Sequence, residues 1–295
     1  MDYLGKYGYA PDQEAIGRAL EIIASNLENF ASEQVYKECF SMMDLTTLKT
    51  DDTPASVAKL VNKVNAFQES YPEWPLPASL CVYPNFASVV AAERKCDFNI
   101  TVVSACFPSS QSFIEVKLKE CEIAVEQGAD EVDIVLSLSK FLAGDYEGAA
   151  EEIRQVRACI DAVAAKQNRK VHLKVILETG LLKTVENIAQ ASFLAMEAGA
   201  DFIKTSTGKV DVNATPTSAF VMCECISRYY NATGRMVGFK PAGGISSAAD
   251  ALCYYSIVSG ILGKQWLNKE WFRFGVSRVA NSILSAVEMK TVSFF

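Results

Sequence analysis

The stretch Gly199-Ala200-Asp201-Phe202-Ile203-Lys204 decides the fold, because it joins a helix end to an apolar strand that carries a lysine. A second turn of the same kind, Gly128-Ala129-Asp130, precedes an apolar run that contains Asp133. In each case the charged residue lies five positions after the glycine. A favourable helix-to-strand turn explains the glycines but not the charges. We therefore expect two βα units to present charged side chains at the same height of a barrel.

Short apolar runs alternate with helical patterns along most of the chain. Strand-like runs occupy residues 41–45, 78–83, 100–105, 131–136, 171–178, 201–205, 236–240 and, more weakly, 271–275. Helix starts are indicated at Thr53-Pro54, at Thr215-Pro216 and at Ser247 with Asp250. Strands that are apolar on both faces and alternate with helices predict a parallel sheet. Eight such units favour a single (β/α)8 barrel in the α/β class.

The expected organisation is one catalytic domain with short extensions. An N-terminal arm and a helix, beginning near Gln13 and reaching Phe30, occupy residues 1–33. The barrel spans residues 34–290, and residues 291–295 form a flexible C-terminal tail. No linker or low-complexity segment divides the 295 residues.

Composition excludes several classes of function. The formal net charge of −7 argues against nucleic acid or an anionic membrane as partner, so an anionic ligand needs a local positive pocket. The nine cysteines form no CxxC, and the chain has neither a signal-peptide pattern nor an apolar run of membrane-spanning length, which together predict a reduced, cytoplasmic protein. With His172 as the only histidine, a multi-histidine metal site is excluded. We expect no metal and no cofactor, and a structural role for His172 in the core.

Three lysines lie inside apolar runs on consecutive predicted strands: Lys174, Lys204 and Lys240. A single strand lysine could simply reach out of the barrel end to solvent. A cluster of three is harder to explain structurally, because buried ammonium groups repel one another and one loses its proton more readily. A lowered pKa is what a nucleophilic amine requires. Asp133 is the evident inward acid, and Asp44 and Glu178 are further candidates.

Glycine-rich loops follow the last three predicted strands. They are Thr207-Gly208-Lys209, Gly243-Gly244-Ile245-Ser246 and Gly275-Val276-Ser277-Arg278. Backbone N–H groups at such loops and at helix N-termini bind phosphate, and the late loops of a barrel are its usual phosphate position. The predicted phosphate-binding residues are Gly208, Lys209, Gly243, Gly244, Gly275, Ser277 and Arg278.

Four segments together resemble the deoxyribose-phosphate aldolase family: Asp44-Leu45-Thr46-Thr47-Leu48, GADFIKTSTGK at 199–209, VNATP at 212–216 and GFKPAGG at 238–244. The similarity runs from about Met43 to Ser277. It implies a class I, Schiff-base aldolase on a (β/α)8 barrel. The implied reaction is reversible cleavage of 2-deoxy-D-ribose 5-phosphate to D-glyceraldehyde 3-phosphate and acetaldehyde, a step of deoxyribonucleotide catabolism.

The resemblance also implies roles for individual residues. Lys204 would form the Schiff base, Lys240 would lower its pKa and Asp133 would move protons through water. Lys174 and Asp44 would complete the charged shell, and Cys81 matches a cysteine of the pocket. An imine delocalises the charge left by carbon–carbon cleavage, so this chemistry needs no metal.

Three departures from the family pattern modify this expectation. The chain ends in Phe295, where the family has a tail tyrosine that helps to move a proton; loss of such a group typically costs 10²- to 10⁴-fold in rate, which predicts a slow aldolase. Ser109-Ser110 replaces a His-Gly pair, and Arg278 replaces a small hydroxyl residue near the phosphate.

Two alternatives therefore stay open beside a working aldolase. One is a barrel retained as a protein-binding scaffold with vestigial activity, which would need a protein partner. The other is an enzyme that keeps the lysine chemistry but acts on a different aldehyde substrate, as Arg278 near the phosphate position suggests. The small phosphorylated sugar or aldehyde is the expected ligand, and the sequence is also compatible with a homodimer.

Overall fold

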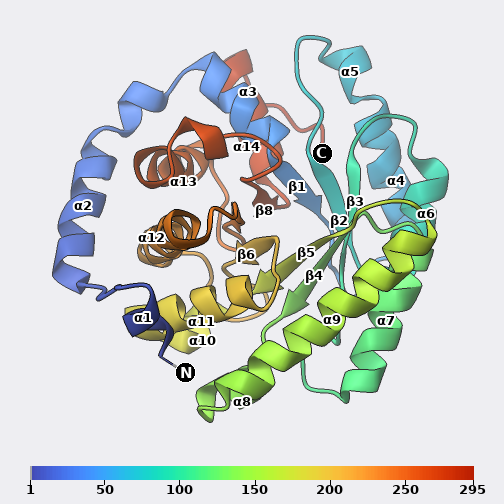
Figure 1. Ribbon diagram of the computed structural model, residues 1–295. Coiled ribbons are helices and arrows are strands. Elements are labelled where there is room, and N and C mark those ends of the chain that lie inside the picture. Colours follow the sequence, from blue (N-terminus) through green and yellow to red (C-terminus); the bar gives the residue numbers. More distant parts are fainter. Residues whose placement is uncertain (1) are drawn as a thin grey trace.

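Eight parallel strands form the centre of the computed structural model, which describes residues 2–295 (Figure 1). The strands are β1 (Met43–Thr46), β2 (Ser79–Val82), β3 (Asn99–Val103), β4 (Glu131–Val135), β5 (His172–Ile176), β6 (Phe202–Lys204), β7 (Gly238–Lys240) and β8 (Phe274–Val276). Their order is β7-β6-β5-β4-β3-β2-β1-β8. Two isolated parallel bridges, Phe239 to Phe272 and Ala242 to Gly275, join the β7 and β8 ends. The predicted (β/α)8 barrel is thereby confirmed.

The predicted strands agree with the observed ones except at the two ends of the barrel sequence. The first strand was expected over residues 41–45 but begins at Met43, because α3 (Glu33–Ser41) continues to Ser41. The last was expected over 271–275 and instead spans Phe274–Val276. Apolar periodicity locates a buried segment but does not separate the end of a packed helix from the start of a strand.

Helices surround the barrel and connect consecutive strands (Figure 1). Besides α3, the α-helices are α1 (Tyr3–Lys6), α2 (Gln13–Ser25), α4 (Pro54–Asn65), α5 (Phe67–Ser70), α6 (Ala87–Glu93), α7 (Ile114–Glu126), α8 (Leu138–Leu142), α9 (Tyr146–Lys166), α10 (Thr179–Leu182), α11 (Val185–Glu197), α12 (Pro216–Thr233), α13 (Ala248–Ile261) and α14 (Val279–Glu288). Short 3-10 helices are η1 (Leu27–Phe30), η2 (Pro84–Phe86) and η3 (Lys264–Trp266). The helix starts predicted at Thr53, Thr215 and Ser247 are confirmed, each as a capping box.

The two Gly-Ala-Asp turns perform the same structural task. Gly128 and Gly199 adopt φ of 105° and 107°, a region that glycine enters without steric cost. Asp130 then accepts a hydrogen bond from the backbone N–H of Ile100 on β3, and Asp201 accepts one from Leu173 on β5, each at 2.9 Å. Each turn therefore ties the start of its strand to the preceding neighbour, which aligns the charged residues farther along β4 and β6.

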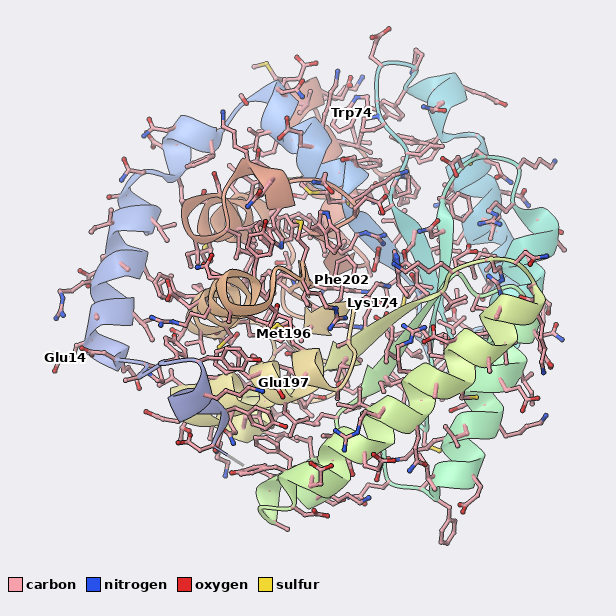
Figure 2. The ribbon with its side chains drawn as sticks, viewed as in Figure 1. Glu14, Trp74, Lys174, Met196, Glu197 and Phe202 are labelled. Atoms are coloured by element: carbon pink, nitrogen blue, oxygen red, sulfur yellow. The ribbon has the colours of Figure 1, made fainter. Side chains whose placement is uncertain are left out.

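The N-terminal arm packs on the helical layer rather than on the barrel mouth. The Tyr7 ring stacks on Phe193 of α11 at 4.4 Å. Glu197, labelled at the end of α11 in Figure 2, accepts from the Tyr7 hydroxyl and from Lys6. The helix expected from residue 13 to 30 ends at Ser25, and η1 continues the path. None of the helices within residues 2–295 combines the length and apolar composition needed to cross a membrane.

The C-terminal tail, expected to be flexible, is packed in the structure. It runs back along α14, where the Asn281 side chain accepts from the backbone N–H groups of Phe294 and Phe295 and donates to the Phe295 carbonyl. The Phe295 ring lies 6.1 Å from Phe40 and 5.3 Å from Phe67, between centroids. Burial of two phenyl rings in an aromatic cluster favours this position over a free tail.

Replacement of Phe295 by alanine should destabilise the protein by about 1–3 kcal/mol, because the ring is partly buried among other aromatic rings. Urea denaturation followed by circular dichroism measures the loss. Phe113→Ala is the matched control, since that ring is 78% exposed and its removal should cost little. Equal stability of the wild type and Phe295→Ala would mean that the tail does not occupy this position in solution.

Candidate active site

Asp133 on β4 forms ion pairs with all three predicted lysines inside the barrel. Its Oδ2 atom lies 2.8 Å from Lys204 Nζ and 2.8 Å from Lys240 Nζ, and its Oδ1 atom lies 3.0 Å from Lys174 Nζ. The three lysines come from β6, β7 and β5. Lys204 is 3% exposed, and the other residues of the group are fully buried. We call Asp44, Asp133, Lys174, Lys204 and Lys240 the lysine cluster.

Asp44 joins this cluster from β1. Its Oδ2 atom lies 2.5 Å from Lys240 Nζ and 3.6 Å from Lys174 Nζ, while its Oδ1 atom accepts from Arg273 at 2.7 Å. Strand pairing explains how residues so distant in sequence meet. Asp133 is paired with Lys174 across β4 and β5, and Lys204 with Lys240 across β6 and β7. Alternation then directs all of these side chains into the barrel.

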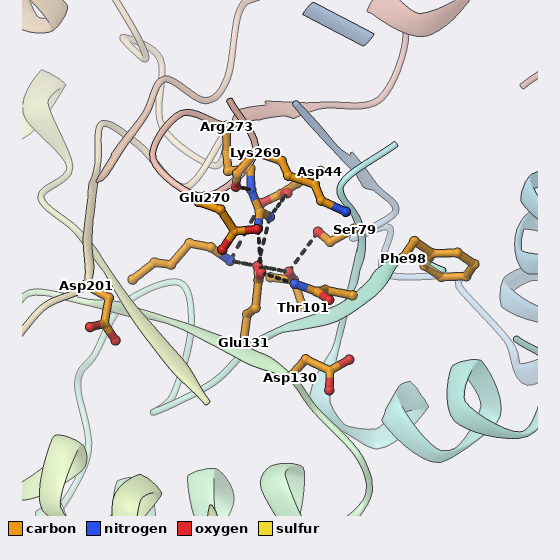
Figure 3. Close-up of polar contacts among 12 residues, drawn as sticks. Asp44, Ser79, Phe98, Thr101, Asp130, Glu131, Asp201, Lys269, Glu270 and Arg273 are labelled. Atoms are coloured by element: carbon orange, nitrogen blue, oxygen red, sulfur yellow. Dashed lines mark hydrogen bonds and ion pairs between the residues drawn. The ribbon is translucent and has the colours of Figure 1, made fainter. Parts of the chain in front are cut away.

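Four further polar residues lie beneath the lysine cluster, nearer the strand starts, and sequence reasoning missed them. Arg273 binds Glu131 with two hydrogen bonds, of 2.7 and 3.1 Å, and Glu131 also contacts the Lys174 ammonium (Figure 3). Thr101 donates to Ser79 or Glu131, each at 2.8 Å (Figure 3). Glu131 could have been found, because it precedes Asp133 by two residues and so shares its face. Arg273 lies just before β8, where the predicted strand was weakest.

The three lysines differ in the direction of their pKa shifts. Burial and the neighbouring Lys240 ammonium together lower the pKa of Lys204, although Asp133 opposes them. Burial acts in the same direction on Lys174 and Lys240. Asp133 with Glu131 nevertheless raises the pKa of Lys174, and Asp133 with Asp44 raises that of Lys240. Lys204 is therefore the lysine that most readily becomes a neutral amine, and burial contributes more to this than Lys240 does.

Charge balance leads to the same lysine. The lysine cluster together with Glu131 and Arg273 comprises four buried cations, Lys174, Lys204, Lys240 and Arg273, and three buried anions, Asp44, Glu131 and Asp133. Burial disfavours ionised carboxyls, but the surrounding cations hold the pKa of all three acids below their usual range. The set is neutral when one lysine loses its proton, which lowers the cost of burying charge.

Cys81, Glu178 and His172 occupy distinct places around the cluster. Cys81 is buried on β2 near the charges of Lys240 and Asp133, and burial raises the pKa of its thiol. Glu178 stands away from the lysine cluster, because its carboxylate binds Thr207. His172 lies at the start of β5 beside Phe202, with ring centroids 6.3 Å apart, and burial lowers the pKa of its imidazole.

A cavity of about 320 Å³ opens above Lys204 at the carboxyl ends of the strands. Its walls include Lys204 and all seven residues predicted to bind phosphate: Gly208, Lys209, Gly243, Gly244, Gly275, Ser277 and Arg278. Gly243 and Gly244 have φ of 80° and 77°, which side chains disfavour, and a Cβ on Gly243 would lie 2.6 Å from Asn213 Oδ1. The glycines thus leave backbone accessible beside the amine.

The N-termini of α13 and α14 differ in whether their backbone N–H groups are free to bind an anion. The Gly243-Gly244 loop is followed by α13, which begins at Ala248 and is capped by Ser247 and Asp250, as predicted. The Asp250 carboxylate already accepts from the backbone N–H groups of Ser246 and Ser247. In contrast, α14 starts after Arg278 with no side-chain cap. Its first N–H groups are the better partner for an anion.

Lys209 crosses the cavity mouth. Its Nζ donates to the Leu48 carbonyl at 2.6 Å, which links the loop after β6 to the loop after β1. The Ser109-Ser110 segment lies in the loop after β3, where Ser110 adopts φ of 56° and accepts from the buried Lys117 ammonium. That hydrogen bond helps a serine to adopt a left-handed conformation that favours glycine.

Fold and site together define a lysine-dependent aldolase built on a (β/α)8 barrel. Residues 39–253 match the model of the DeoC/LacD family of aldolases. The chain belongs to this family, and it is therefore a class I aldolase, a carbon–carbon lyase.

Curated relatives cover most of the chain. It is 42% identical over 255 residues to human deoxyribose-phosphate aldolase, an alignment that spans 82% of this chain and 77% of the relative. Identity to the bovine enzyme of the same name is 40%, with the same coverage. Among solved structures, the deoxyribose-phosphate aldolase of Aeropyrum pernix matches with a TM-score of 0.67 at 22% identity, over 95% of this chain and all of that one. This structural match shows the shared fold.

Removal of Glu131 should be costly, because Arg273 and Lys174 would lose a buried counter-charge. We expect Glu131→Ala to reduce the free energy of unfolding by about 3–5 kcal/mol. Glu122→Ala, which removes a partly exposed partner of the exposed Lys119, should change the free energy of unfolding little. Chemical denaturation of both variants beside the wild type measures the difference. Similar small losses in both would argue against a dry, fully paired network.

Proposed function

We propose that this protein cleaves 2-deoxy-D-ribose 5-phosphate reversibly to D-glyceraldehyde 3-phosphate and acetaldehyde. The observation that carries the proposal is the position of Lys204: a buried amine of lowered pKa, hydrogen-bonded to Asp133, in the wall of a cavity rimmed by glycine loops. Relatives at 38–42% identity that carry the name deoxyribose-phosphate aldolase support the same substrate.

In this proposal the neutral Lys204 amine attacks the C1 aldehyde carbon. Water leaves the carbinolamine, and a protonated imine forms between Lys204 and C1. The C3 hydroxyl then loses its proton while the C2–C3 bond breaks. The electron pair of that bond moves into the imine and gives an enamine, and glyceraldehyde 3-phosphate is released. Protonation at C2 and hydrolysis of the imine free acetaldehyde and restore Lys204.

Asp133 and Lys240 have complementary parts in these steps. The Asp133 carboxylate stays ionised beside the Lys174 and Lys240 ammonium groups, so it can accept a proton through water and return it. Lys240 shares Asp133 Oδ2 with Lys204 and remains protonated, which compensates the carboxylate and favours a neutral Lys204. Lys174 and Asp44 hold Asp133 and Lys240 in place, and Cys81 lies beside them as a neutral pocket residue.

The phosphate would lie at the rim of the cavity between Gly243-Gly244 and the uncapped start of α14. Ser277 and Arg278 flank that helix start, and Arg278 adds a positive charge to a site that otherwise relies on backbone groups and Lys209. This arrangement favours phosphorylated substrates over neutral aldehydes.

The comparisons favour an enzyme over the scaffold alternative, and the charge-balanced lysine cluster supports the same choice. We also propose that the protein works in the cytoplasm and forms a homodimer. Phe295 lies among Phe40 and Phe67, so its missing hydroxyl slows turnover only if the tail leaves α14 and enters the cavity.

Borohydride trapping tests the nucleophile directly. With 2-deoxyribose 5-phosphate or acetaldehyde present, reduction should add one substrate-derived mass to Lys204, located by peptide mass spectrometry. Lys204→Met should abolish both the adduct and retro-aldol activity. Lys290→Met is the control, since that ammonium is exposed. An adduct on Lys174 or Lys240 in the folded wild type would contradict the assignment.

The pH dependence of trapping should move when Lys240 is replaced. Only the neutral amine reacts, so the trapping rate falls as pH drops below the pKa of Lys204. The Lys240 ammonium lowers the pKa of Lys204. Lys240 also competes with Lys204 for Asp133, the carboxylate that raises the pKa of Lys204. Lys240→Met should therefore shift the midpoint to higher pH. A pH series of borohydride trapping measures the shift, and an unchanged or lower midpoint would refute the tuning role.

A further inference from the structure

We propose that Glu178 is a positioning residue, whose buried carboxylate holds the Thr207–Lys209 loop in the shape that receives the phosphate. This inference rests on the proposed function, because it concerns the phosphate end of the same site. Glu178 contacts neither the lysine cluster nor, in this proposal, the substrate. It acts through Thr207, which lines the cavity together with Gly208 and Lys209.

A bulge after β5 delivers the carboxylate to this loop. The backbone N–H of Leu177 donates to the Lys204 carbonyl, and that of Thr179 donates to the Thr205 carbonyl, each at 2.9 Å. Between these two hydrogen bonds the chain after β5 advances by two residues, from Leu177 to Thr179, whereas the chain after β6 advances by one, from Lys204 to Thr205. Glu178 is therefore the extra residue of the bulge. Bulges of this kind redirect a side chain next to an active site.

The backbone of Glu178 adopts a strained conformation. Its φ and ψ are 56° and 58°, a left-handed conformation that non-glycine residues rarely adopt. Such conformations persist where the surrounding structure enforces them, and they are frequent at functional sites. Here the conformation points a charged side chain towards Thr207, in the loop after β6.

The contacts of the carboxylate form a short relay into the phosphate loop. Glu178 Oε2 accepts from the Thr207 hydroxyl at 2.6 Å, and Oε1 accepts from the Thr207 backbone N–H at 3.2 Å. The Thr207 Oγ1 atom in turn accepts from the Lys209 backbone N–H at 3.0 Å. Both ends of the three-residue loop are therefore fixed by one carboxylate, directly at Thr207 and indirectly at Lys209.

The charge of Glu178 is not explained by ion pairing. Its side chain is 2% exposed, and among the described residues its carboxylate is held by the hydroxyl and the backbone N–H of Thr207 rather than by a lysine or an arginine. A buried carboxylate held only by neutral donors is costly, so it indicates a requirement for strong acceptors at this point. The loop that it orders contains Gly208, which adopts φ of 78° and is conformationally free by itself. Ordering it in advance lowers the entropy cost of phosphate binding.

Glu178→Gln tests the proposal, because it keeps the size of the side chain but removes one of the two acceptors. We expect KM for 2-deoxyribose 5-phosphate to rise about ten-fold with kcat changed less than about two-fold, as loss of one charge-assisted hydrogen bond allows. The kcat/KM for unphosphorylated 2-deoxyribose should change less than about two-fold. Glu186→Gln, on the exposed face of α11, is the matched control.

A pair of Thr207 variants tests the relay itself. Thr207→Val removes the hydroxyl at nearly constant shape and should raise KM for the phosphorylated sugar as Glu178→Gln does. Thr207→Ser keeps the hydroxyl and should restore KM towards the wild-type value. A merely structural role for Glu178 would instead lower the rates with both sugars equally, and that result would overturn the proposal.

Titration with orthophosphate, followed by ³¹P NMR, separates this proposal from the proposed function. Binding should weaken about ten-fold in Glu178→Gln, whether or not the wild type turns over any sugar. If the wild type binds orthophosphate but cleaves neither sugar, the proposed function fails while the loop assignment stands. Unchanged phosphate affinity in folded Glu178→Gln would overturn the loop assignment.

Discussion

The carboxylate of Asp133 is the constraint on which the site depends. The amino groups of three lysines converge on its two oxygen atoms in the buried interior of the barrel. Without this anion, the cations of β5, β6 and β7 would repel one another at short range in a medium of low dielectric constant. The same carboxylate opposes deprotonation of Lys204, and burial together with Lys240 overcomes that opposition. Reactivity and stability thus depend on the same few contacts.

The network below the lysine cluster makes this arrangement possible. Arg273 and Glu131 bind each other with parallel hydrogen bonds and hold Asp44 and Lys174 from beneath. Their contribution is orientation, because neither lines the open cavity above Lys204. A layered interior of this kind separates the lower part of the barrel, which fixes positions, from the upper part, where a ligand meets the amine and the glycine loops.

Binding at the rim depends on backbone geometry more than on net charge, since the chain as a whole is acidic. Glycines with positive φ, the uncapped start of α14 and Arg278 supply a local positive field above a neutral amine. The C-terminal tail takes no part in this surface. It packs on the outer helices through Phe294 and Phe295, and the apolar side chains of the tail therefore stabilise the fold.

The sequence by itself determined the barrel, the three lysines, Asp133 and Asp44, and the glycine loops. Repeated apolar runs specify buried strands, and lysines inside such runs are too costly to be incidental. Only the tertiary structure decided that Arg273 and Glu131 complete the charge balance, that α14 starts without a side-chain cap, that Glu178 turns away to Thr207, and that the tail packs. These outcomes depend on barrel closure, which brings β8 beside β1 and aligns side chains from distant strands, and local sequence patterns carry no record of such non-local contacts.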